Sequence, residues 1–213
     1  MDFQLIETFG YWPGDAAAAR HWPLHRQRLL DSARALGWAL PATAMAAIDT
    51  LVGALAHQCS KPARCRLTLD RRGRSTLERS EMPPAVRQWK LALADDTLDA
   101  DDPMLRHKTT ARAVYDRARA TMPEGVDEVL LLNQRGELCE GSVSNLFLQI
   151  GNQWCTPALS SGLLPGVLRA RLLATGQIEE RVLYREDLAT ASAICVGNSL
   201  RGLIPCELLV GTG

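Results

Sequence analysis

Lys108 is the residue of this chain whose type and surroundings most clearly predict chemistry. Among 24 basic side chains only Lys61, Lys90 and Lys108 are lysines, and the others are arginines. Arginine stays charged and is a poor amine nucleophile, so it cannot replace lysine where a free amine must react. Lys61 lies in a turn-like stretch and Lys90 in a strand-like run, whereas Lys108 follows an acidic, proline-containing segment and opens a helix-like stretch. This context suits a lysine that forms a Schiff base, but from these residues alone a solvated surface lysine is the commoner case.

The elements that must position this lysine mix strands and helices. Alternating apolar residues predict strands, and apolar residues at helical spacing, with proline starts and glycine stops, predict helices. The expected strands cover residues 3–9, 65–69, a partner after the turn at 71–73, 89–94, 129–132, a partner from 138, 154–155 and 194–209 with a break at 197–199. The expected helices cover the stretch from Trp22-Pro23 to Gly37, residues 42–57 and 109–120, and a helix that opens at Leu164-Pro165-Gly166. Hairpins occur in both halves, which predicts a mixed α/β (α+β) fold with antiparallel pairs.

An acidic stretch divides the chain. Residues 95–103 contain five aspartates and no hydrophobic period, which is typical of a linker. The predicted organisation is an N-terminal α/β domain over residues 1–95, a linker over 96–106 and a C-terminal domain over 107–213.

Composition excludes several classes of protein. The formal net charge is zero, which provides no general attraction to nucleic acid or to an anionic membrane. No apolar run reaches the roughly 20 residues of a membrane span, and the first residues lack a secretory signal, so we expect a cytoplasmic protein. The six cysteines form no Cys-x-x-Cys pair and have no histidine at zinc-finger spacing. We expect reduced, buried thiols and no metal site.

Four features occur along the chain in a specific order. They are Arg28 in His25-Arg26-Gln27-Arg28, Lys108 in His107-Lys108-Thr109-Thr110, Glu140 before Gly-Ser-Val-Ser-Asn, and Leu164-Pro165-Gly166 with Gly197-Asn198-Ser199. Together they resemble the fold-type IV pyridoxal-phosphate enzymes, which include branched-chain and D-amino acid aminotransferases and 4-amino-4-deoxychorismate lyase. The resemblance covers nearly the whole chain and is closest to the lyase branch. It implies a small N-terminal α/β domain, a C-terminal β-barrel-like domain with helices, and a homodimer.

The resemblance implies a cofactor-binding set for pyridoxal 5'-phosphate. Lys108 corresponds to the Schiff-base lysine, and Glu140 to the carboxylate that keeps the pyridine nitrogen protonated. Arg28 corresponds to the phosphate-binding arginine. The N–H groups of Val167 and Leu168 at a helix start would bind the phosphate on one side, and Asn198 and Ser199 on the other. Asn145 fits equally a role in the local turn and a contact with the ring edge.

The substrate-facing residues are less well defined. Thr8, Arg112 and Arg201 are candidate substrate-binding residues; the two arginines would pair with carboxylates if they face the site, and otherwise they are surface charges. The chain departs from the family in beginning at a later strand, in Gly10 where many relatives have arginine, and in Ala111 where asparagine is frequent.

Three functions remain open. The leading hypothesis is a lyase like 4-amino-4-deoxychorismate lyase, which eliminates pyruvate from a small-molecule amino substrate and leaves 4-aminobenzoate, a step of folate biosynthesis. The second is an aminotransferase for branched-chain or D-amino acids that uses the same residues. The third is a non-catalytic homologue that binds a small ligand. We expect no nucleic-acid or membrane partner.

Overall fold

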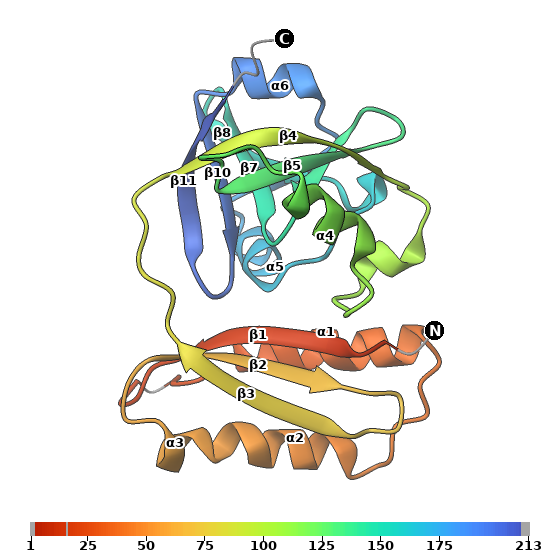
Figure 1. The fold of residues 1–213 in the computed structure, drawn as a ribbon, viewed down its shortest axis with the longest axis vertical. Helices are drawn as coiled ribbons and strands as arrows, with labels where there is room; N and C mark the ends of the chain where they lie inside the picture. Colours follow the sequence, from red (N-terminus) through yellow and green to blue (C-terminus); the bar gives the residue numbers. More distant parts are fainter. Residues whose placement is uncertain (1–2, 16, 210–213) are drawn as a thin grey trace. The chain divides into compact units, whose positions relative to one another are not determined.

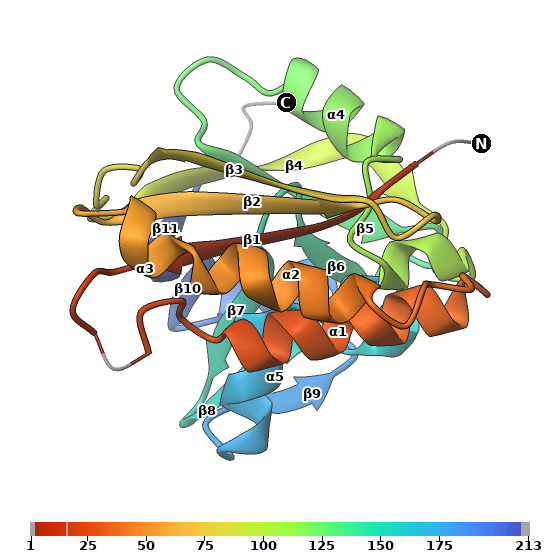
Figure 2. The ribbon, with the colours of Figure 1, turned by 90° about the horizontal axis from the view of Figure 1, so that it is seen from below.

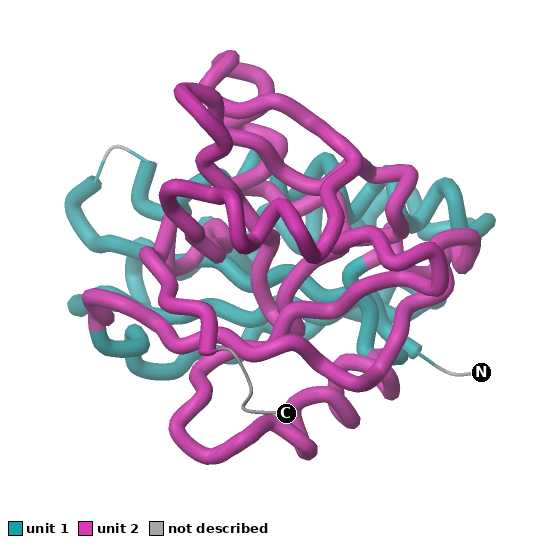
Figure 3. Tube along the Cα trace, turned by 90° about the horizontal axis from the view of Figure 1, so that it is seen from above, with its two compact units in different colours: residues 1–84, 108–111 teal, residues 85–107, 112–213 magenta. Residues whose placement is uncertain are grey.

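The chain forms two compact units in a computed structural model that describes residues 3–15 and 17–209 (Figure 3). The first unit contains residues 1–84 and 108–111, and the second contains residues 85–107 and 112–213. Met1 and Asp2, part of the N-terminal stretch interpreted above, lie outside the described residues. Lys108 thus belongs to the first unit although most of its sequence neighbours belong to the second.

The first unit is a small antiparallel sheet with helices on one face (Figures 1 and 2). Its strands follow the order β1 (Leu5–Tyr11), β2 (Ala63–Leu69) and β3 (Ser75–Glu81), and its helices are α1 (Trp22–Ala35), α2 (Ala44–Gly53) and α3 (Leu55–Gln58). Odd-numbered residues of β1 and β2, such as Phe9 and Leu67, pack with Leu29, Ile48 and Leu55 of the helices. Because side chains alternate along a strand, the even-numbered residues lie on the opposite face.

The helices of this unit follow the predicted signals. Pro23 lies in the first turn of α1, and Gly37 has a φ of +66°, so it ends the helix in a left-handed conformation that glycine adopts without strain. The helix expected over residues 42–57 is divided into α2 and α3.

The second unit is a barrel-like sheet. Its strands are β4 (Trp89–Leu98), β5 (Glu128–Asn133), β6 (Leu138–Gly141), β7 (Asn145–Ile150), β8 (Gln153–Pro157), β9 (Glu179–Arg181), β10 (Ala193–Asn198) and β11 (Gly202–Leu208). They follow the order β10-β11-β4-β5-β6-β7-β8-β9, and an additional pairing of β10 with β7 closes the ring. The mixed α/β class and the barrel-like second unit confirm the predicted fold class.

Helical segments accompany this sheet. They are η1 (Pro103–Arg106), α4 (Ala113–Ala120), η2 (Leu159–Ser161), α5 (Val167–Ala174) and α6 (Arg185–Thr190). Leu168 and Leu172 of α5 pack against Phe147 of β7 and Cys195 of β10, so the start of α5 is fixed to the strands that close the ring.

The division of the chain differs from the predicted boundaries at residues 95/96 and 106/107. Trp89–Leu98 is a single strand that pairs with β11 and β5, so residues 85–95 belong to the second unit. The segment 96–106, expected as a linker, contains the end of β4 and η1. Aspartates there cap turns, as when the Asp102 carboxylate accepts a hydrogen bond from the Met104 N–H.

No helix in the described ranges is long and apolar enough to cross a membrane. Within the same ranges, no three His, Cys, Asp or Glu side chains gather in a way that could hold a metal ion.

Candidate active site

Lys108 lies in an extended segment joined to β1, not in a helix. The Ile6 N–H donates to the Lys108 carbonyl at 2.8 Å, and the Thr110 N–H donates to the Gln4 carbonyl at 2.9 Å. Leu5 and Thr109 form an antiparallel bridge between these bonds. The helix expected over residues 109–120 therefore begins only at Ala113, because the backbone groups of 108–110 are used by β1.

This pairing determines the side of the small sheet to which the Lys108 side chain projects. Residues opposite each other in an antiparallel pair project to the same side, and Leu5 with Thr109 takes the helix-covered side. Lys108 and Ile6 therefore share the other side. We call this side the Lys108 face; it comprises Lys108, Ile6, Thr8 and Gly10 together with their cross-strand partners Thr68, Arg66 and Arg64.

Thr8, a predicted substrate-binding residue, lies on the Lys108 face opposite Arg66. Arg66 is partly exposed, and its Nη1 lies 3.9 Å from a carboxylate oxygen of Glu78 on β3. The neighbouring row pairs Gly10 with Arg64. The face beside the lysine is therefore rich in hydroxyl and guanidinium groups.

Arg28, the predicted phosphate ligand, is held by a buried carboxylate. Its Nε donates to Glu7 Oε1 at 2.9 Å and its Nη2 to Glu7 Oε2 at 2.5 Å, while His25 Nδ1 lies 2.6 Å from Glu7 Oε2. Burial raises the pKa of Glu7, but the charge of Arg28 and the hydrogen bonds from His25 and Arg28 outweigh it and lower that pKa to about 2. Glu7 is thus ionised and takes the Nε–Nη2 edge of Arg28, and the phosphate contact of Arg28 stays a prediction.

Glu140 is buried in the second unit within a defined set of donors. Its carboxylate accepts hydrogen bonds from the Tyr115 hydroxyl at 2.7 Å, from Asn145 Nδ2 at 3.2 Å and from the Leu164 N–H at 3.1 Å. Burial and the neighbouring Glu140 charge raise the pKa of Tyr115 far above its ordinary value, so this hydroxyl remains a donor. A carboxylate fixed in this way can stabilise a protonated ring nitrogen.

Asn145 has hydrogen bonds that fit the structural role left open by the sequence, and its contact with the ring edge stays a prediction. Its Nδ2 donates to Glu140 and also to the Leu164 carbonyl at 3.0 Å. Gly166 allows this position, since a Cβ there would lie 1.8 Å from Asn145 Oδ1. The asparagine therefore ties the Glu140 carboxylate to the segment that leads into α5.

The turn between β6 and β7 is organised by Glu128, which the sequence analysis did not identify. Its fully buried carboxylate accepts hydrogen bonds from the N–H groups of Val129, Ser142 and Val143 and from the hydroxyls of Ser142 and Ser144. A Cβ on Gly141 would lie 2.8 Å from Glu128 Oε2. The turn thus joins Glu140 to its partner Asn145 in a fixed register.

Arg112 also contacts this turn. Its Nη2 donates to the Ser142 carbonyl, and its guanidinium lies 4.8 Å from the centre of the Tyr115 ring. The predicted contact of Arg112 with substrate remains a prediction, and the structure assigns the residue a part in holding the turn.

The predicted phosphate-binding segments lie in the second unit. Gly166 precedes α5, and no side chain among the described residues caps the N–H groups of Val167 and Leu168 at this helix start. Asn198 Nδ2 donates to the Val143 carbonyl, and its Oδ1 accepts from the N–H groups of Leu200 and Arg201. Asn198 therefore shapes the β10–β11 turn that carries Ser199.

Arg201, the other candidate for a substrate carboxylate, follows Ser199 in the same turn. Its guanidinium lies 5.3 Å from the centre of the Trp89 ring.

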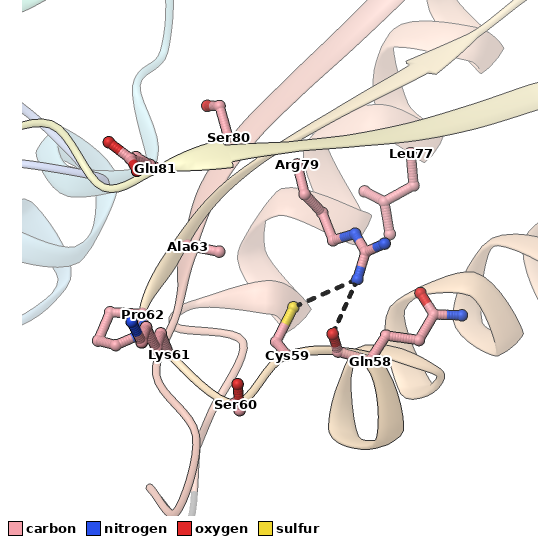
Figure 4. A pocket seen from close by; sticks show the side chains of 10 residues that line it. All are labelled: Gln58, Cys59, Ser60, Lys61, Pro62, Ala63, Leu77, Arg79, Ser80 and Glu81. Atoms are coloured by element: carbon pink, nitrogen blue, oxygen red, sulfur yellow. Dashed lines mark hydrogen bonds between the residues drawn. The ribbon is translucent and has the colours of Figure 1, made fainter.

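A shallow hollow elsewhere in the first unit contains none of the predicted site residues. Its wall includes Cys59, Lys61 and Arg79, and the Arg79 guanidinium donates to the Gln58 carbonyl at 3.0 Å (Figure 4).

Glu7 and Glu128 each had a signal in the sequence. Both are acidic residues within or at the start of apolar strands, Leu5-Ile6-Glu7 and Glu128-Val129-Leu130. A carboxylate in such a position is buried only when it is paired or fully hydrogen-bonded. That rule identifies them as members of buried networks but does not name their partners.

Comparison with known proteins identifies the family. The model for "Amino-transferase class IV" matches residues 4–209. The chain belongs to the class IV aminotransferases. Members of this family are pyridoxal-phosphate enzymes, so the chain is an enzyme and pyridoxal phosphate is its cofactor.

Three relatives show the range of activities. A Mesorhizobium loti crystal structure described as a "Putative amino-acid aminotransferase" is 42% identical, with a TM-score of 0.90 over 98% of this chain and 100% of that chain. A "Putative aminodeoxychorismate lyase" of Schizosaccharomyces pombe is 28% identical over 88% of this chain and 84% of its own length. A "Probable branched-chain-amino-acid aminotransferase" of Thermotoga maritima is 33% identical over 48% of this chain and 39% of its own.

The donor set fits pyridoxal phosphate. A buried, donor-held carboxylate suits a protonated pyridine nitrogen, and a helix start without a side-chain cap suits a phosphate, as does an arginine oriented by Glu7.

Proposed function

We propose that this enzyme is a lyase that eliminates pyruvate from 4-amino-4-deoxychorismate and leaves 4-aminobenzoate. The observation that carries the proposal is the chemistry of the Lys108 face. Arg66 and Arg64 accompany Thr8 there, whereas an enzyme for branched aliphatic side chains needs an apolar wall. A substrate with two carboxylates is matched by such cations.

Two relatives support the same assignment. The alignment with the S. pombe protein covers most of both chains. A protein of Saccharomyces cerevisiae named "Aminodeoxychorismate lyase" is also 28% identical, over 54% of this chain.

The bound cofactor would supply an electron sink for the pair of electrons left at the amine-bearing carbon. Lys108 would act as the base that removes the proton from that carbon. Glu140 would hold the proton on the ring nitrogen, and Arg28 with the start of α5 would bind the phosphate. The substrate's bond to the enolpyruvyl oxygen then breaks, the enolpyruvate takes up a proton to become pyruvate, and the carbon ring becomes aromatic. No oxidant or water is consumed.

The second candidate is an amino-acid aminotransferase. It is favoured by the 42% identical M. loti structure, whose description names that activity. In this case Lys108 would again remove the proton from the amine-bearing carbon and would then return it. The amino group would pass to the cofactor, and water would supply the carbonyl oxygen of the keto acid that leaves. We do not retain the non-catalytic alternative, because the chain keeps all four cofactor-binding features. The family resemblance supports a homodimer.

One assay separates the two reactions. Purified enzyme loaded with pyridoxal phosphate is incubated with 4-amino-4-deoxychorismate, and pyruvate is followed with lactate dehydrogenase in the absence of any keto acid. We expect pyruvate and 4-aminobenzoate in equal amounts, and no product from Lys108→Ala. Turnover that requires an added keto acid, with an amino acid as donor, would establish the aminotransferase instead.

A further inference from the structure

Gly10 leaves space for an aromatic ring on the Lys108 face. A Cβ at this position would lie 2.1 Å from both Cη2 and Cζ3 of the Trp12 indole. The direction of that Cβ is the side shared with Thr8 and Ile6, because these residues alternate with the helix-facing residues of β1. The indole of Trp12 therefore lies over Gly10.

The backbone around Trp12 is fixed to β1. The Trp12 N–H donates to the Ala18 carbonyl at 2.8 Å, and the Arg20 N–H donates to the Gly10 carbonyl at 3.1 Å. Tyr11 and Ala19 form an antiparallel bridge between them. These bonds bring Arg20 back beside Gly10 although ten positions separate them in the chain.

Arg20 places a positive charge beside the Trp12 indole. Its Cζ lies 3.8 Å from the centre of the Trp12 indole, which is a close cation–π stack. Its Nη2 lies 3.1 Å from Asp15 Oδ2, and both side chains are about half exposed. Such an exposed pair is weak, so a substrate carboxylate can compete with Asp15 for the guanidinium.

The position of this stack relative to Lys108 suits the far end of a substrate. Ile6 lies opposite Lys108, and Gly10 follows four residues later, about 13 Å along β1 at the usual strand rise. Gly10 thus lies on the same side of the sheet as Lys108 but well separated from it, which suits the end of a substrate opposite its reacting amine. Arg64 lies directly opposite Gly10 and adds a second cation to the same row.

We propose that Trp12 and Arg20 form the distal wall of the substrate site, where the indole packs against an unsaturated ring and Arg20 pairs with the ring carboxylate. The inference rests on the proposed function and deepens it, because it assigns the carboxylate farthest from the reacting amine to named residues. Gly10 is then the residue that makes room for this wall.

The test uses the enzyme loaded with pyridoxal phosphate and the variants Arg20→Gln, Trp12→Phe and Trp12→Ala. Arg71→Gln, in the exposed turn between β2 and β3, is the control. We expect Arg20→Gln to raise the KM for 4-amino-4-deoxychorismate about 10- to 100-fold, the loss of one charge-assisted hydrogen bond, with kcat nearly unchanged. Trp12→Phe should have a smaller effect than Trp12→Ala, and Arg71→Gln none.

A binding measurement provides a readout independent of turnover. Calorimetry compares 4-aminobenzoate with aniline, which lacks the carboxylate. We expect wild type and Arg71→Gln to prefer 4-aminobenzoate and Arg20→Gln to lose that preference.

The outcomes separate the two claims. A wild type that releases no pyruvate would overturn the proposed lyase, while the preference for 4-aminobenzoate over aniline still tests the subsite. An Arg20→Gln enzyme with an unchanged KM or unchanged preference would overturn the distal wall. If Trp12→Ala fails to fold, shown by its unfolding midpoint, Arg20→Gln and Trp12→Phe still decide.

Discussion

Glu128 is expected to control cofactor binding without touching the cofactor. Its Oε1 accepts hydrogen bonds from the N–H and the hydroxyl of Ser142 in the β6–β7 turn and from the Val129 N–H of β5. Its Oε2 accepts two more from the turn, from the Val143 N–H at 3.1 Å and the Ser144 hydroxyl at 2.8 Å. In Glu128→Gln, one of these oxygens becomes an NH2 group. Since a backbone N–H cannot accept a hydrogen bond, at least one donor of the turn then faces another donor.

The magnitude follows from the bonds lost. A hydrogen bond to a charged acceptor contributes about 1.5 to 3 kcal/mol, and a buried donor left unsatisfied costs a similar amount. We expect Glu128→Gln to lower the free energy of unfolding by about 3 to 5 kcal/mol. Because the turn joins Glu140 to Asn145, we also expect the affinity for pyridoxal phosphate to fall at least ten-fold.

The matched control is Glu137→Gln. Glu137 is also a buried carboxylate of the second unit, and it accepts hydrogen bonds from Asn133 and Arg135 in the β5–β6 hairpin. Arg135 and Asn133 outweigh burial and lower its pKa to about 2, so this variant also loses a charged acceptor. Urea unfolding and equilibrium dialysis with pyridoxal phosphate are measured for both. If Glu128→Gln loses stability but binds the cofactor as tightly as Glu137→Gln does, the positioning role is refuted.

Three further results are expected. In Lys108→Ala, borohydride should fix no pyridoxal phosphate to the protein, and the absorbance of a cofactor held as a Schiff base should be missing. A spectrum like that of wild type would exclude Lys108 as the attachment point. Gly166→Ala places a methyl group against Asn145 Oδ1 and should weaken cofactor binding in dialysis, whereas Gly53→Ala in α2, with no atom within 4 Å of its Cβ, should not. Glu7 has a pKa of about 2 instead of about 4.5, so it contributes roughly 3 kcal/mol of stability that is fully present above pH 4.5 and is lost as the pH falls towards 2. Urea unfolding of wild type and Glu7→Gln at pH 6 and pH 3 should therefore show the difference shrinking at the lower pH, and a constant difference would contradict this.

The family and its cofactor could be predicted from the sequence. A scarce lysine, a glutamate before Gly-Ser-Val-Ser-Asn and a proline-glycine helix start are local patterns, and their order along the chain indicated the family and its cofactor. The strand from Cys65 to Leu69 and the helix from Trp22 were predictable for a similar reason, because the spacing of their apolar residues is a local pattern.

The positions of these groups were decided only by tertiary structure. The helix-like pattern after Lys108 is overridden because Gln4 and Ile6, about a hundred residues earlier, take the backbone hydrogen bonds of residues 108–110. Local periodicity records which side chains are apolar, but it contains no information on a backbone partner so distant in sequence. For the same reason, the positions of Glu7 and Glu128 in apolar strands indicate only that each carboxylate is buried. The partners that give each one its role come from elsewhere in the chain.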